Sequence, residues 1–247
     1  MKLLLDIGNS AVKWALSAGR ELGEAGRFVH RGADFMQQAT LAWSGIAAPQ
    51  AVVVANVAGA AVADQLQAWT QRQWQQSPQF LVATGAAGGV RNGYAEPHTL
   101  GIDRWAAMVA AYAECRSAVC VADCGTAITL DLVDADGLHR GGLILAGIDL
   151  MRAALQGNTA NLRAADTTHS LQLLATGTGD AIASGSVYAA AAAIEQIGKQ
   201  MLAQCKQEPR LLLTGGDALR VLPLLGIACK HDPGLVLKGL AILSGDG

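Results

Sequence analysis

The chain has 247 residues, of which 51% are hydrophobic and 15% charged, and its formal net charge is −2. This composition is typical of a globular protein, excludes a disordered one, and gives no reason to expect nucleic acid as a partner. Asp6 interrupts the first leucines too early for a signal peptide, and the apolar run 181–194 is too short to span a membrane. The five cysteines lack metal-ligand spacing, so we expect buried thiols in a cytoplasmic protein.

The first half of the chain has the pattern of an α/β domain. Apolar and alternating runs predict strands, and longer runs with one polar face predict helices. In chain order we expect strands at 2–6, 11–17 and 21–30, a helix at 34–43, a strand at 51–55, a helix at 60–75, a strand at 79–83, a Gly-rich segment at 85–93 and a helix at 100–115.

The second half opens in the same way as the first. We expect strands at 118–122, 127–133 and 138–145, helices at 149–156 and 180–204, a strand at 210–214 and a helix at 235–243. Three strands followed by alternating helices and strands therefore occur in both halves. This repetition predicts two related α/β domains, 1–116 and 117–247.

A short phrase recurs where the first strand of each half ends. Asp6-Ile7-Gly8-Asn9-Ser10 stands in the first half and Asp123-Cys124-Gly125-Thr126-Ala127 in the second. Glycine lets a backbone approach a phosphate, and hydroxyl, amide and backbone N–H groups can donate to its oxygens. Lys13 would add a positive charge, whereas Asp6 would act through a cation or water. Each turn alone also fits an ordinary β-turn, but together they favour a phosphate-transfer site.

Two further segments carry candidate chemistry. Asp103 and Arg104 stand side by side at the start of a predicted helix. They fit either a helix cap with a surface ion-pair partner, or a general base beside a cation that holds an anionic substrate. Thr214-Gly215-Gly216 ends a strand, where a Gly pair permits close approach of a flat ligand such as adenine or forms a plain turn. The histidines show no ligand spacing, and only His98 lies inside the segment before Asp103; they are His30, His98, His139, His169 and His231.

These four motifs are the two Asp-x-Gly phrases, the segment with Asp103 and Arg104, and Thr214-Gly215-Gly216. In their order along the chain they resemble the motifs of type III pantothenate kinase, a branch of the superfamily of sugar kinases, actin and heat-shock ATPases. The resemblance implies two similar ribonuclease H-like (actin-like ATPase) domains with a nucleotide cleft between them. It also implies ATP-dependent phosphorylation of pantothenate to 4′-phosphopantothenate, the first step of coenzyme A biosynthesis. Ala146-Gly147 stands where Pro-Gly is expected, which affects only the local loop.

The resemblance also assigns roles, with Asp103 as general base and Asp123 at a monovalent cation, potassium or ammonium, alongside magnesium on the nucleotide. The pantothenate pocket would comprise Tyr94, Gly101, Ile102, Asp103, Arg104 and Thr178. ATP would be bound by Asp6, Ile7, Gly8, Asn9, Ser10, Ala11, Val12, Lys13 and Thr126. The protein would be a homodimer with its substrate pocket near the subunit contact. Two alternatives are a kinase for another small hydroxy acid and a non-catalytic, nucleotide-dependent regulatory protein.

Overall fold

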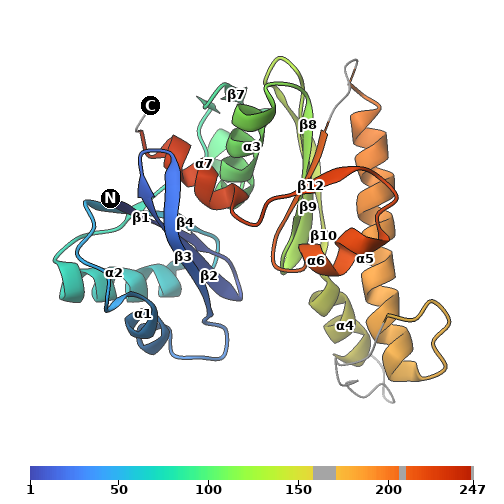
Figure 1. The fold of residues 1–247 in the computed structure, drawn as a ribbon, viewed down its shortest axis with the longest axis horizontal. Helices are drawn as coiled ribbons and strands as arrows, with labels where there is room; N and C mark the ends of the chain where they lie inside the picture. The colour runs from blue at the N-terminus through green and yellow to red at the C-terminus, as the bar shows by residue number, and fades with distance from the viewer. Residues whose placement is uncertain (158–170, 206–209, 246–247) are drawn as a thin grey trace. The chain divides into compact units, whose positions relative to one another are not determined.

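The computed structural model describes residues 1–157, 171–205 and 210–245, and these form two compact units (Figure 1). The first unit comprises Met1–Arg116, Gly137–His139 and Gly234–Gly247, and the second comprises Ser117–Asp136 and Arg140–Pro233. Two pieces of the sequence after residue 116 therefore lie with the first unit. His169 lies outside the described residues.

The first unit is built on a five-stranded sheet with the order β3-β2-β1-β4-β5. Its strands are β1 (Lys2–Ile7), β2 (Ala11–Ala18), β3 (Glu21–Val29), β4 (Ala51–Asn56) and β5 (Gln79–Phe80). β1 and β2 are antiparallel, whereas β4 is parallel to β1. Because side chains alternate along a strand, Leu3, Leu5 and Ile7 face one core cluster, in which Trp43 and Trp69 are also buried.

Helices pack against this first sheet and against each other. α1 (Phe35–Trp43) and α2 (Ala60–Trp74) supply residues to the tryptophan-containing core, while α3 (Ile102–Cys115) packs on α7 (Leu235–Leu243). Asp34 caps α1, because its carboxylate accepts hydrogen bonds from the N–H groups of Met36 and Gln37. The short elements of this unit are β6 (Ala86–Ala87), β7 (Val90–Arg91) and the 3₁₀ turn η1 (Pro97–Thr99).

The second unit repeats the strand order of the first. Its sheet runs β10-β9-β8-β11-β12, with β8 antiparallel to β9 and parallel to β11. The strands are β8 (Val119–Cys124), β9 (Ala127–Val133), β10 (His139–Ala146), β11 (Arg210–Thr214) and β12 (Cys229–His231). The expectation of two similar α/β domains is thereby confirmed.

The helices of the second unit are α4 (Ile148–Gly157), α5 (Thr178–Leu202), α6 (Ala218–Val221) and the 3₁₀ turn η2 (Leu222–Leu224). α5 packs on β8 and β9 through a face that includes Val187, Ala191 and Ile194. No helix within the described parts of the chain is both long and apolar enough to cross a membrane.

Most expected elements occur, with boundary differences that have local causes. The helix expected from residue 100 begins at Ile102, because Gly101 has an extended backbone with ψ 129°. The strand expected at 79–83 pairs only at Gln79 and Phe80. β12 was not expected, because the three residues of Cys229–His231 show no clear alternation and become a strand only by pairing with β11.

Candidate functional site

The first glycine turn connects β1 to β2. Gly8 donates its N–H to the Ala11 carbonyl at 3.1 Å, which closes the turn over Asn9 and Ser10. Asp6 pairs with Lys13 across the two strands, so both side chains leave the same face of the sheet. The structure thus brings a buried carboxylate and a lysine together beside the turn.

The second glycine turn connects β8 to β9 and has the same construction. Gly125 donates its N–H to the Ala127 carbonyl at 3.0 Å, and Asp123 occupies the position on β8 that Asp6 occupies on β1. The turn is one residue shorter than the first, with Thr126 directly before β9. Each unit therefore presents one such turn from its two central antiparallel strands.

Two further segments pack against the second turn, and the sequence alone had not connected either of them with it. Gly147 donates its N–H to the Thr126 carbonyl at 3.1 Å, so the Ala146-Gly147 departure adjoins the turn itself. Gly215 has a φ of +97°, and a Cβ there would overlap the Cys124 carbonyl oxygen. The Gly pair after β11 is therefore required in part by the protein's own backbone, and only Gly216 has open space beside it.

The third candidate segment lies at the start of α3. Gly101 is the N-cap residue, and Asp103 stands in the first turn, where its carboxylate accepts the Arg104 N–H at 2.8 Å. Arg104 is only 8% exposed, and its Nη1 donates to the Tyr94 hydroxyl at 3.1 Å. Asp103 is therefore not the N-cap residue, although its carboxylate still accepts an N–H of the first turn, and Arg104 is not the surface partner that the alternative interpretation expected.

Asn92 shapes the loop that carries Tyr94. Its side-chain amide donates to the carbonyls of Thr84 and Pro97, each at 3.2 Å, and its oxygen accepts the Tyr94 N–H at 3.0 Å. Sequence reasoning missed Asn92, although an asparagine between the Gly-rich segment and Pro97 is a turn signal that could have marked it.

The predicted substrate residues divide between the two units. Tyr94, Gly101, Ile102, Asp103 and Arg104 belong to the first unit, whereas Thr178 is the exposed first residue of α5 in the second. Ile102 is buried, so its side chain belongs to the core. His98, inside the same loop, is exposed and lies 3.9 Å from Glu96.

The residues around the second turn fit a weakly held cation. Asp123 and Thr214 are paired in register on β8 and β11, so both point to the same face, and Thr214 Oγ1 is buried without a hydrogen-bond partner among the described residues. Carboxylate and hydroxyl oxygens are suitable ligands for such an ion. The described residues form no cluster of three or more metal-ligating side chains.

The thiols beside the second turn are not activated. Burial raises the pKa of Cys120 to about 12 and raises the pKa of Cys124 still further, with nearby Asp123 adding to the effect on Cys124. Both thiols are therefore neutral at physiological pH and unsuited to nucleophilic chemistry. The prediction of buried thiols is confirmed for these two residues but is wrong for Cys115, Cys205 and Cys229, which are only partly buried.

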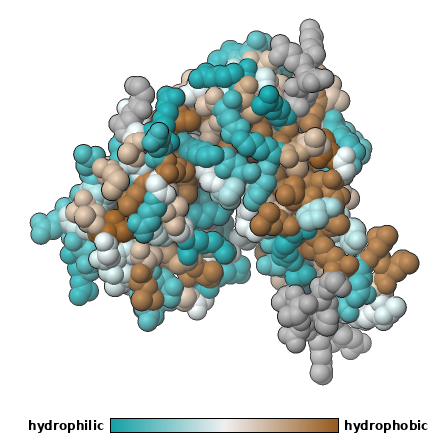
Figure 2. Space-filling view, in the orientation of Figure 1, coloured by the Kyte–Doolittle hydropathy of each residue, from teal (hydrophilic) through white to brown (hydrophobic). Residues whose placement is uncertain are grey.

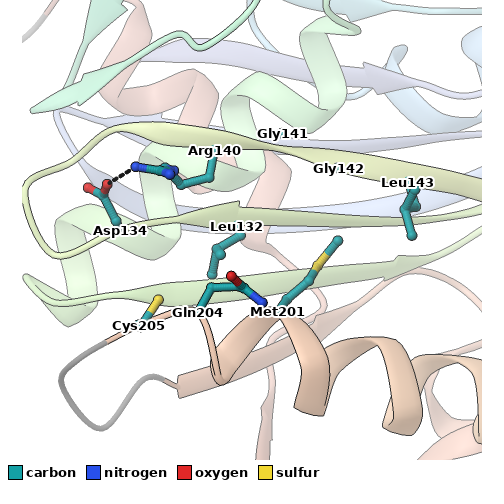
Figure 3. Close-up of a pocket in the computed structure, with 9 residues that line it drawn as sticks. All are labelled: Leu132, Asp134, Arg140, Gly141, Gly142, Leu143, Met201, Gln204 and Cys205. Atoms are coloured by element: carbon teal, nitrogen blue, oxygen red, sulfur yellow. Dashed lines mark ion pairs between the residues drawn. The ribbon is translucent and has the colours of Figure 1, made fainter.

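A separate cavity of about 580 Å³ lies in the second unit, beside β9, β10 and the end of α5 (Figure 3). An ion pair between Arg140 and Asp134, with 3.7 Å between nitrogen and oxygen, stands at one end. The cavity is lined by Leu132, Asp134, Arg140, Gly141, Gly142, Leu143, Met201, Gln204 and Cys205. None of the predicted site residues is among them.

The two matching sheets, each with its glycine turn, define an actin-like fold. The same fold occurs in component A of (R)-2-hydroxyglutaryl-CoA dehydratase from Acidaminococcus fermentans, with a TM-score of 0.54 and 13% identity over 98% of this chain and 95% of that one. It also occurs in the ethanolamine utilization protein EutJ from Carboxydothermus hydrogenoformans, with a TM-score of 0.52 and 10% identity over 98% and 89% of the two chains.

Sequence comparison is more specific. A model of the type III pantothenate kinase family matches residues 2–200. The type III pantothenate kinase of Nitrosococcus oceani is 42% identical over 100% of this chain and 94% of its own length, and that of Halorhodospira halophila is 38% identical over 97% and 96%. The chain belongs to the type III pantothenate kinase family.

Proposed function

We propose that this protein catalyses the ATP-dependent phosphorylation of pantothenate to 4′-phosphopantothenate, the first step of coenzyme A biosynthesis. Membership of the family supports this activity. The observation that carries it is the arrangement at the start of α3, where the Asp103 carboxylate adjoins the buried Arg104 and its hydrogen-bonded partner Tyr94. A base, a cation and a phenol hydroxyl within one small region suit a substrate with both a hydroxyl and a carboxylate.

Asp103 would orient and deprotonate the primary hydroxyl of pantothenate. General base catalysis of this kind contributes about 10²- to 10⁴-fold to a rate. Arg104 and Tyr94 would hold polar groups of the substrate, because a buried guanidinium binds an anion more strongly than an exposed one. Gly101 and Ile102 would contribute backbone groups, and Thr178 would complete the pocket.

ATP would be bound by Asp6–Lys13 and by Thr126, since phosphoryl transfer depends mainly on positioning and on charge neutralisation. Lys13 supplies a positive charge beside the first turn, and Asp6 would act on the nucleotide through bound water or magnesium. Asp123, with Thr214 beside it, would hold the monovalent cation, potassium or ammonium. These cations would supply positive charge toward the phosphate oxygens.

The protein would work as a homodimer in the cytoplasm. Two hydrophobic residues of the edge strand β10 are well exposed, Leu143 at 47% and Ile144 at 63%. The outer face of α5 is exposed at Ala181, Gly185, Ala189 and Ala192. Figure 2 shows hydrophobic side chains on the visible surface of this second unit. Sedimentation of the wild type should give twice the chain mass.

The decisive experiment measures ADP release from MgATP with and without pantothenate, in potassium and in sodium, with Asp103→Asn beside the wild type. We expect release that requires pantothenate and potassium and that collapses in the variant. Release without pantothenate dependence would indicate another hydroxy-acid acceptor or an ATPase. Nucleotide binding without any release would favour the regulatory alternative.

A further inference from the structure

A short segment after β9 packs against the Tyr94 loop. Arg91 donates its N–H to the Gly137 carbonyl at 2.7 Å, and Arg91 also forms a parallel bridge with Leu138. Gly93 lies so close to His139 that a Cβ on Gly93 would overlap the His139 carbonyl oxygen. The backbone of Gly137–His139 is thus fixed against the residues that precede Tyr94.

The side chain of His139 extends this contact to Tyr94 itself. The imidazole is only 1% exposed and stacks on the Tyr94 ring, with 5.7 Å between centroids and 16° between the ring planes. This separation and angle fit an offset aromatic pair. His139 lies far from Tyr94 in the sequence, and a lone histidine at a strand start carries no local signal of such a role.

Tyr94 is also in contact with Arg104. The guanidinium carbon lies 5.9 Å from the centre of the Tyr94 ring, and Nη1 donates to its hydroxyl. Tyr94 itself is half-buried, so part of it remains accessible. Tyr94 therefore contributes to holding Arg104, and its own ring stacks on His139.

We propose that His139 is a positioning residue for pantothenate, which holds the Tyr94 ring in the orientation that keeps Arg104 directed at the substrate. This inference rests on the proposed function, because it takes Tyr94 and Arg104 as pantothenate-binding groups. His139 needs no proton transfer for this role. The role requires only a flat ring at residue 139, and the close contact between the His139 backbone and Gly93 keeps that ring in place.

Two substitutions of similar size separate the ring from simple packing. His139→Leu largely keeps the side-chain volume but removes the aromatic stack. We expect the KM for pantothenate to rise about three- to tenfold, which is the equivalent of one aromatic pair, and the KM for ATP to stay unchanged. In His139→Phe the stack remains, and both constants should stay within about twofold of the wild type. His98→Leu, at an exposed histidine of the same loop, is the matched control.

A double-mutant cycle with Tyr94→Leu tests whether His139 acts through Tyr94. Once Tyr94 is replaced, the further change His139→Leu should have little effect on the KM for pantothenate. Additive effects, equal changes in both KM values, or a Phe variant as impaired as the Leu variant would overturn the proposal. Failure of the wild type to phosphorylate pantothenate would instead overturn the proposed function. Thermal unfolding of each variant identifies a loss of folding, which the larger Phe ring can cause by overpacking at this buried site, and in that case the cycle with Tyr94→Leu decides the proposal.

Discussion

The Nε2 atom of His30 lies 2.7 Å from the carbonyl oxygen of Gly8, the first residue of the first glycine turn. The backbone N–H groups of His30 and Arg31 both donate to the Ser10 carbonyl, at 3.2 and 3.3 Å. The carbonyl oxygens of Gly8 and Ser10 are thereby occupied by hydrogen bonds within the protein. Since a carbonyl oxygen repels a phosphate, these contacts favour a turn that presents donors to a nucleotide.

We expect His30→Ala to raise the KM for ATP by about two- to tenfold, because one hydrogen bond contributes about 0.5–1.5 kcal/mol. The KM for pantothenate should not change. Steady-state kinetics at saturating co-substrate measure both constants, and His30→Gln, which can still donate, should recover part of the loss. A rise in both constants by the same factor would show that His30 supports the unit in general and not the turn.

Asp103→Asn should lower kcat by about 10²- to 10⁴-fold, since the amide keeps the size of the side chain but cannot accept the hydroxyl proton. The Kd for MgATP, measured by calorimetry, should stay near that of the wild type. Asp64→Asn, at an exposed position of α2, is the matched control and should leave kcat unchanged. A kcat within tenfold of the wild type would exclude Asp103 as the base.

Gly8→Ala should weaken ATP binding, whereas Gly215→Ala should lower the stability of the fold. A Cβ on Gly8 would lie 3.6 Å from the Ala11 carbonyl oxygen, an ordinary contact, so the variant should fold but bind ATP more weakly. Gly215 has a positive φ and no room for a Cβ, so its alanine variant should lose more than about 1 kcal/mol of unfolding free energy. Urea unfolding and the KM for ATP distinguish the two, and Gly216→Ala, in open space, serves as the control for Gly215. Equal stability of the two Gly-pair variants would contradict the crowding inferred at Gly215.

The buried thiols of the second unit predict a loss of stability at alkaline pH. A cysteine in the unfolded chain has a pKa of about 8.5, whereas burial raises the pKa of Cys120 to about 12 in the folded state. Above about pH 8.5 the unfolded state therefore releases a proton that the folded state retains. The stability that Cys120 contributes is fully present below that pH and is lost by about 1.4 kcal/mol per pH unit until the pH reaches the folded pKa.

Urea unfolding between pH 8 and 10.5 measures this slope. Cys120→Ala should be less stable at pH 8 because of its cavity, yet its stability should fall less steeply with pH. The two proteins differ only at residue 120, so the difference in slope isolates the Cys120 thiol. Parallel curves for the two proteins would show that Cys120 ionises normally in the folded state.

Sequence reasoning predicted what depends on short stretches of chain. Strand periodicity and the two Asp-x-Gly phrases are local patterns, so the matching sheets and both turns followed from them. Other contacts depend on which distant segments meet in the fold, and no single stretch of sequence predicts them. They are His30 at Gly8, His139 at Tyr94 and Gly147 at Thr126. Burial of Arg104 was missed for the same reason, because an arginine at a helix start is usually exposed.

The placement of α7 affects how the chain can fold. Lys2, on the first strand, donates from Nζ to the backbone carbonyl of Ser244 at 2.9 Å, and α7 packs on α3 and β1. The first unit is consequently assembled from the two ends of the chain. During synthesis, α3 and β1 must wait for the last residues before their apolar surface is covered. Contacts of such long sequence separation slow folding, so the first unit can be completed only after the sequence of the second unit has been made.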